Sequence, residues 1–118
     1  MKNVLAFCTL ILSLLLAGCS SSSPGEHDAF AQCLTDNGVK MFGAYWCPHC
    51  QNQKELFGNS WEKVNYIECS LPGGQGQTAF CEQQGITGYP TWEFGDGSRV
   101  PGEISLEELS GKSGCPLV

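Results

Sequence analysis

The spacing of apolar positions changes several times along the chain, and each change predicts an element. From residue 26 to residue 37, apolar side chains recur at helical spacing, and Gly38 is placed to end this helix. Residues 39–46 then form a short, mostly apolar run with β-favouring side chains, which predicts a buried strand. Pro48 suits a first helical position, so a second helix is expected to begin at the cysteine before it and to end at Gly58.

The second half of the chain alternates in the same way. Its segments predict a strand, a glycine-rich loop, a short helix, a hairpin and a last helix, at residues 64–69, 71–77, 78–84, 91–100 and 105–112. Strands separated by helices pair in parallel, whereas a hairpin pairs antiparallel. We therefore expect an α/β protein in which a mixed central sheet of about four strands is flanked by helices.

The first residues have the pattern of an export signal. Lys2 precedes an almost unbroken apolar run at residues 4–16, which is too short to span a bilayer because a spanning helix needs about 20 apolar residues. Residues 16–19, LAGC, resemble the lipobox of bacterial lipoproteins, which implies cleavage after Gly18 and acylation of Cys19. An ordinary signal peptide with an unmodified cysteine is the alternative.

This pattern divides the chain into three parts. We expect a signal peptide over residues 1–18, a lipidated cysteine with a flexible serine-rich tether over 19–25, and one folded domain over 26–118. For the tether, a capping box of Ser23 and Glu26 that opens the first helix is an equal alternative.

Composition indicates an oxidising compartment. The 118-residue chain has eight cysteines, and cytosolic thiols are kept reduced, so this density favours disulfides formed outside the cytoplasm. The net charge of −6, without a basic cluster that could bind phosphates, argues against nucleic acid as a partner. We expect a monomer that a lipid anchor holds to a bacterial membrane, on its periplasmic face.

Residues 47–50, CPHC, carry the chemistry that the sequence predicts. A cysteine at a helix N-terminus faces unpaired backbone N–H groups and the positive end of the helix dipole, so the thiolate of Cys47 is expected to be stabilised. A protonated His49 would add to this stabilisation. Cys50, one turn further on and expected to be more buried, would resolve a mixed disulfide formed at Cys47. This chemistry requires neither a metal nor a cofactor.

Three alternatives for these residues stay open. The pair could be a permanent disulfide that only staples the chain, although so short a loop constrains the unfolded chain little. It could supply half of a zinc site, although Cys69, Cys81 and His49 form no second closely spaced pair. His49 itself could be a solvated loop residue.

Four segments together resemble the thioredoxin-like domain of bacterial and plant vitamin K epoxide reductase homologues. The resemblance covers nearly all of residues 29–115 and is carried by residues 43–50 (GAYWCPHC), 53–58 (QKELFG), 66–69 (YIEC) and 88–92 (GYPTW). It implies a thioredoxin-like fold and a quinone-linked membrane thiol oxidoreductase as a partner. The same Pro-His pair occurs in the periplasmic dithiol oxidase of enterobacteria, which favours oxidation of substrates over their reduction.

The resemblance also assigns a substrate site opposite the cysteines. Pro90 matches the cis-proline that faces the cysteine pair in thioredoxin-like folds, and its neighbours Tyr89 and Thr91 would contact an extended substrate segment. A plain trans turn proline is the alternative. Trp46 and Trp92 are candidates for an apolar rim around the site, although core packing is expected for at least one of them.

The four remaining cysteines of the domain allow three pairings. Cys69 ends a strand and Cys81 lies in the helix that follows, so these two are expected to close a local loop. Cys33 would then pair with Cys115 and tie the first helix to the C-terminal tail. Free buried thiols are the alternative for each.

The predicted function is an extracytoplasmic thiol-disulfide oxidoreductase that acts on protein thiols and disulfides. Cys47 exchanges with substrate, Cys50 resolves, His49 tunes the pair and Pro90 shapes the substrate groove. The first alternative is a disulfide reductase fed by a membrane electron donor. The second is a binding module that uses the fold as a scaffold with its cysteine pair permanently closed.

Overall fold

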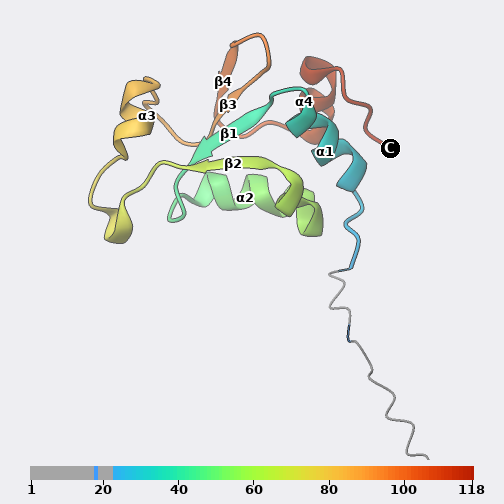
Figure 1. Cartoon of the computed structure of the whole chain (residues 1–118), viewed down its shortest axis with the longest axis horizontal. Coiled ribbons are helices and arrows are strands. Elements are labelled where there is room, and N and C mark those ends of the chain that lie inside the picture. The colour runs from blue at the N-terminus through green and yellow to red at the C-terminus, as the bar shows by residue number, and fades with distance from the viewer. Residues whose placement is uncertain (1–17, 19–22) are drawn as a thin grey trace, which may run out of the picture.

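The computed structural model describes Gly18 and residues 23–118 (Figure 1). The predicted acylation site Cys19 and almost all of the predicted signal peptide lie outside the described residues. No helix in the described part is long and apolar enough to cross a bilayer. The capping box of Ser23 and Glu26 does not form, because the first helix begins after His27, whose backbone N–H is held by the Ser60 hydroxyl at 2.9 Å.

Ten short elements make up the domain. In chain order they are α1 (Asp28–Asp36), β1 (Lys40–Gly43), α2 (Pro48–Phe57), η1 (Gly58–Lys63), β2 (Asn65–Glu68), η2 (Pro72–Gly74), α3 (Ala79–Gln83), β3 (Thr91–Glu93), β4 (Arg99–Pro101) and α4 (Leu106–Ser113). The four strands form one mixed sheet in the order β2-β1-β3-β4. β1 and β2 are parallel, and the other two pairs are antiparallel. This arrangement confirms the expected α/β architecture and is that of a thioredoxin-like fold.

β1 is shorter than the strand that the sequence predicts. The apolar run continues to residue 46, but the chain turns after Gly43, where the Cys47 N–H donates to the Ala44 carbonyl at 3.0 Å. This turn carries the chain from the carboxyl end of β1 directly into α2. The cysteine pair therefore lies just beyond the carboxyl end of β1, which is an inner strand of the sheet.

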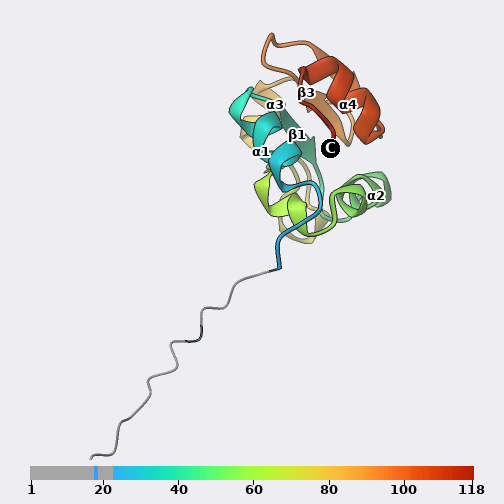
Figure 2. The same cartoon turned by 90° about the vertical axis from the view of Figure 1, so that its right-hand side faces the viewer.

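Alternation along β1 divides the core between the two sheet faces. Met41 lies in one cluster with residues of α1, α2 and α4, and Figure 2 shows these three helices gathered around β1 and β3. Phe42 lies in a second, smaller cluster with Ile86 and the bridged Cys69 and Cys81. Helices therefore cover both faces of the sheet.

Gln53 fixes α2 to the sheet from inside the first cluster. Its side chain is fully buried, its Oε1 accepts from Trp92 Nε1 at 3.1 Å and from the Ile104 N–H at 2.9 Å, and its Nε2 donates to the Ile104 carbonyl at 3.0 Å. Trp92 is thus the core tryptophan of the two rim candidates. This polar side chain, hydrogen-bonded inside the core through both its oxygen and its nitrogen, connects α2, β3 and the segment after β4.

Two disulfides close the fold, with the pairing expected from the sequence. Cys33 bonds Cys115 across a separation of 82 residues, and Cys69 bonds Cys81 across 12. In the chain-entropy model the longer bridge stabilises by about 4 to 5 kcal/mol and the shorter by about 3 kcal/mol. The first joins α1 to the tail after α4, and the second joins the end of β2 to α3.

Candidate active site

Cys47 and Cys50 stand at the N-terminus of α2. Cys47 is the N-cap residue with extended backbone angles, Pro48 follows at the first helical position, and the Cys50 N–H donates to Cys47 Sγ at 3.2 Å. The sulfur of Cys47 thus occupies the place where a helix stabilises an anion, because the first backbone N–H groups have no partner within the helix. Among the cysteines that the structure describes, these two are free thiols.

The two sulfurs differ in surroundings more than in exposure. Cys47 is 4% and Cys50 is 5% exposed, so the expectation that Cys50 is the more buried of the two is wrong. Cys47 lies against the segment around Pro90, where its Sγ donates to the Tyr89 carbonyl at 3.7 Å. Burial, followed by the hydrogen bond with Cys47, raises the pKa of the Cys50 thiol to about 12.

Pro90 follows Tyr89 through a cis peptide bond, as the sequence predicts. The Tyr89 carbonyl is directed to Cys47 Sγ, and the Tyr89 hydroxyl accepts from Gln77 Nε2 at 2.8 Å. Thr91 is buried, and its hydroxyl donates to the Gly88 carbonyl at 2.8 Å. The Thr91 side chain therefore holds the loop that carries Pro90 and offers no free donor to a substrate.

Trp46 forms an apolar edge of the site. Its side chain is 51% exposed, its Nε1 donates to Ser70 Oγ at 2.8 Å, and its ring meets the Tyr89 ring edge-on at 5.9 Å between centroids. Tyr45, which the sequence reasoning did not single out, is exposed next to it. A large aromatic ring that is held by a hydrogen bond and still exposed suits contact with an apolar segment of another chain.

His49 is exposed and paired with an acid. Its Nδ1 lies 2.7 Å from Glu103 Oε1, and Asn52 Nδ2 donates to the same oxygen at 3.2 Å. The bond from His49, followed by the bond from Asn52, lowers the pKa of Glu103. Glu103 lies between β4 and α4, and sequence reasoning missed it because nothing in the local pattern reports a contact with a residue 54 positions away.

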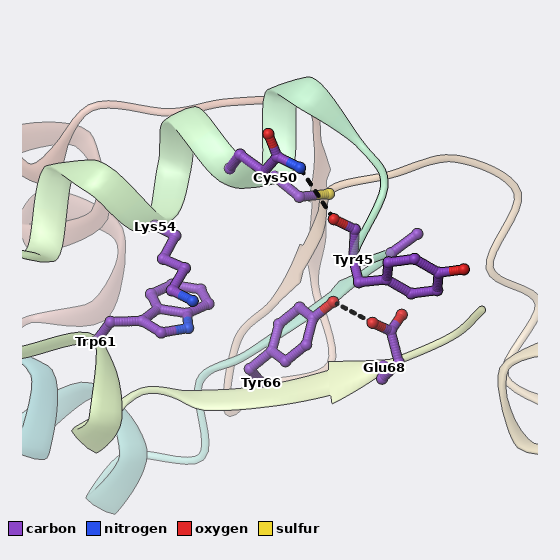
Figure 3. Close-up of a pocket in the computed structure, with 8 residues that line it drawn as sticks. Tyr45, Cys50, Lys54, Trp61, Tyr66 and Glu68 are labelled. Atoms are coloured by element: carbon purple, nitrogen blue, oxygen red, sulfur yellow. Dashed lines mark hydrogen bonds between the residues drawn. The ribbon is translucent and has the colours of Figure 1, made fainter. Parts of the chain in front are cut away.

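A cavity opens beside Cys50 on the sheet face that α2 covers. It has a volume of about 210 Å³ and is lined by Ala44, Tyr45, Cys50, Gln51, Lys54, Trp61, Tyr66 and Glu68 (Figure 3). The Tyr66 hydroxyl donates to Glu68 Oε1 at 3.2 Å, and the Ser70 N–H donates to Glu68 Oε2 at 3.1 Å. Sequence reasoning missed this pair, although the spacing of Tyr66 and Glu68 in a strand already places both on one face.

Metal ligation finds no support in the part of the chain that the structure describes. No group of three or more histidine, cysteine or acidic side chains gathers there in a way that could hold a metal ion. Cys69 and Cys81, the candidates for completing a zinc site, are bonded to each other. Cys47 and Cys50, the other pair in that interpretation, are both free thiols.

Comparison with known proteins supports this chemistry. No protein-family model matches the chain. A curated relative, thiol-disulfide oxidoreductase LTO1 of Arabidopsis thaliana, is 42% identical over 102 residues, which make up 83% of this chain and 27% of LTO1. The chain thus spans about a quarter of that relative's length. Most of this chain is therefore similar to one part of a protein named for thiol-disulfide exchange.

Proposed function

We propose that this chain is a protein thiol-disulfide oxidoreductase in which Cys47 exchanges with the substrate and Cys50 resolves. The observation that carries the proposal is the free pair at the N-terminus of α2 with the Tyr89 carbonyl against Cys47, while the domain's four other cysteines are bridged. Similarity to LTO1, whose name states this activity, supports it.

Oxidation of a substrate dithiol begins with the pair as a disulfide. A substrate thiolate attacks Cys47 Sγ, the bond between the two cysteines breaks, and its electron pair stays on Cys50, which takes up a proton. The second substrate thiolate then attacks the substrate sulfur of the mixed disulfide, and Cys47 leaves as a thiolate beside the helix N-terminus. The substrate loses two electrons and the pair gains them. Reduction of a substrate disulfide follows the same steps in reverse.

The substrate segment lies in extended form along the loop that carries Pro90. Tyr89 presents its backbone at the cysteine pair, and the exposed Trp46 ring with the Tyr89 ring supplies an apolar contact. Backbone pairing of this kind gives affinity without requiring a particular sequence. The substrates are therefore unfolded or extended protein segments that carry cysteines.

Oxidation is the favoured direction, and the favoured setting is outside the cytoplasm. A thiolate stabilised at the helix N-terminus favours the reduced pair, which makes the disulfide a stronger oxidant. The apolar run at residues 4–16 and the LAGC sequence ending at Cys19 support export and lipid anchoring. A quinone-linked thiol oxidoreductase in the same membrane would then return the pair to the disulfide.

A redox titration of the full chain tests the proposal. The chain is equilibrated in glutathione buffers, and peptide mass spectrometry follows the Cys47–Cys50 bond, with Cys47→Ser as the inactive control. We expect this bond to open before the two structural bridges, at a potential well above roughly −270 mV, and the oxidised chain to form disulfides in a reduced, unfolded protein. A potential at or below that value would instead indicate a reductase. A pair that stays closed would indicate a binding module.

A further inference from the structure

Each turnover of the cysteine pair moves a proton onto or off Cys50. The thiol is almost fully buried, and burial and the hydrogen bond with Cys47 raise its pKa to about 12, so it is protonated at neutral pH. Only the thiolate attacks the Cys47 sulfur of a mixed disulfide. A nearby group that exchanges this proton would therefore accelerate the resolving step.

The absence of a side chain at Gly43 brings a tyrosine ring to this sulfur. β1 pairs with β2 so that Met41 lies opposite Tyr66 and Gly43 opposite Glu68, which places all four on one sheet face. A Cβ at Gly43 would lie 2.8 Å from Tyr66 Cε2 and 3.1 Å from Cys50 Sγ. The ring and the sulfur thus flank the same point of the β1 backbone.

Tyr66 connects this point to a carboxylate that is held in place. Its hydroxyl donates to one oxygen of Glu68, and the Ser70 backbone holds the other (Figure 3). Burial, followed by the charge of Glu68, raises the pKa of Tyr66, so the phenol remains a donor at neutral pH. The cavity shared by Cys50, Tyr66 and Glu68 is large enough for water molecules.

The other titratable groups that line the cavity are not suited to this exchange. Lys54, one turn after Cys50 on α2, has an exposed side chain that solvent reaches directly. Tyr45 is 52% exposed at the outer edge. β1 and η1 contribute no charged side chain to the lining, and His49 and Glu103 lie outside it. Glu68 is the carboxylate of this cavity.

We propose that Glu68 exchanges a proton with Cys50 through the Tyr66 hydroxyl and the water-sized space of the cavity, with Tyr66 as the positioning residue. The proposal rests on the proposed function, because only a cycling pair needs this exchange. It gives the cavity a role in catalysis that is separate from the substrate groove around Pro90.

In the reducing direction the proton balance is as follows. Cys50 passes its proton to the Glu68 carboxylate as its sulfur attacks Cys47 Sγ in the mixed disulfide. The bond between Cys47 and the substrate sulfur breaks, and the electron pair leaves with the substrate thiolate, which takes a proton from water. In the oxidising direction the protonated Glu68 returns the proton to Cys50 when Cys50 leaves as a thiolate.

The rate of the resolving step in Glu68→Gln tests this role. The reduced full chain is mixed with oxidised glutathione, quenched with acid, and mapped by mass spectrometry for the Cys47–glutathione adduct and its conversion to the Cys47–Cys50 disulfide. Glu62→Gln, an exposed residue on η1 that lines no part of the cavity, is the matched control because it removes the same charge. We expect adduct formation at the wild-type rate in both variants, and resolution about a hundredfold slower in Glu68→Gln only.

If Glu68 acted only through its charge, Glu68→Gln would make resolution faster instead of slower. Its charge raises the pKa of Cys50, so removing that charge without loss of a proton acceptor would speed resolution. Unchanged or faster resolution in Glu68→Gln therefore overturns the proposal. Slower resolution that recovers toward wild type as the pH rises supports it, because hydroxide then replaces the carboxylate, whereas a distorted fold would stay slow.

Tyr66→Phe gives an independent reading. Loss of the hydroxyl should slow resolution while leaving adduct formation unchanged, and resolution at the wild-type rate would count against the path through Tyr66. Failure of the proposed function has a different signature, since wild type itself would then form no adduct at Cys47.

Discussion

His49 Nδ1 and Glu103 Oε1 lie 2.7 Å apart, so the charge expected from the active-site histidine is opposed by a carboxylate. The sequence gives no sign of this pairing, and it changes the role expected of His49. An imidazolium alone would stabilise the Cys47 thiolate, whereas an imidazolium paired with a carboxylate would add little net charge near the helix N-terminus.

The first prediction follows from the sign of each charge. Glu103→Gln removes a negative charge, which should stabilise the Cys47 thiolate and raise the potential of the Cys47–Cys50 couple. His49→Ser leaves the negative charge unopposed and should lower that potential. Each shift should be on the order of 10 mV, because both side chains are exposed to solvent. A glutathione titration of both variants measures the two shifts.

Glu107→Gln is the matched control for Glu103→Gln. Glu107 is also an exposed acid, in the first turn of α4, and forms no ion pair with His49. We expect the Cys47–Cys50 couple of Glu107→Gln to have the same potential as in wild type. If His49→Ser and Glu103→Gln shift the potential in the same direction, the two residues do not act on Cys47 through opposite charges.

The second prediction concerns the bridge between β2 and α3. Replacing Cys69 and Cys81 together by Ala should lower the free energy of unfolding by about 3 kcal/mol, since a bridge across a short loop restricts the unfolded chain to that extent. Urea denaturation of the oxidised chain measures the change. The Cys47–Cys50 couple should keep its potential, and a large shift would mean that the bridge also shapes the active site.

Local signals in the sequence predicted the elements but not the contacts between distant ones. Pro48 and the apolar run before it placed the cysteine pair at a helix start, which the structure has at Cys47. The pairing of Glu103 with His49 depends on how the segment after β4 packs, and no local pattern encodes that packing. The length of β1 was overestimated because the chain turns within an apolar run.

Gln53, inside the core, is a second residue whose contacts the local sequence does not predict. A glutamine in the second turn of a polar helix suggests a solvated position, yet it is completely buried and bonded to Trp92 and Ile104. Tyr66 and Glu68 are a different case. Their alternation in a strand was visible, but the Gly43 opposite them acquires its meaning only once the register of β1 and β2 is known.

The third prediction concerns Cys19 and rests on the sequence. Cys19→Ala should move the chain from the membrane fraction to the soluble fraction without loss of redox activity, because acyl chains on this residue are the expected anchor. Cys8→Ala, within the expected signal peptide, is the control and should leave the chain in the membrane fraction. Membrane association of Cys19→Ala equal to that of wild type would contradict the lipoprotein interpretation.

The fourth prediction concerns the buried amide that holds α2 to the sheet. Gln53→Leu keeps a similar volume but leaves the Trp92 Nε1–H and the N–H and carbonyl of Ile104 without partners in the core. Each unpaired buried group costs about 1 to 3 kcal/mol, so the free energy of unfolding should fall by about 3 kcal/mol or more. Urea denaturation followed by tryptophan fluorescence measures the loss, since Trp92 is itself a partner.

Gln83→Leu on α3 is the control for this change, because Gln83 is exposed and the same substitution there removes no buried hydrogen bond. It should leave the free energy of unfolding within about 0.5 kcal/mol of wild type. Gln53 also lies three residues after Cys50, so its loss should loosen the helix that carries the resolving cysteine. We therefore expect Gln53→Leu to slow conversion of the Cys47 adduct to the Cys47–Cys50 disulfide at temperatures where the variant is still folded. A variant as stable as wild type would contradict this prediction. It would mean that three buried polar groups can lose their partners here at no cost, although buried amide and indole groups are normally hydrogen-bonded.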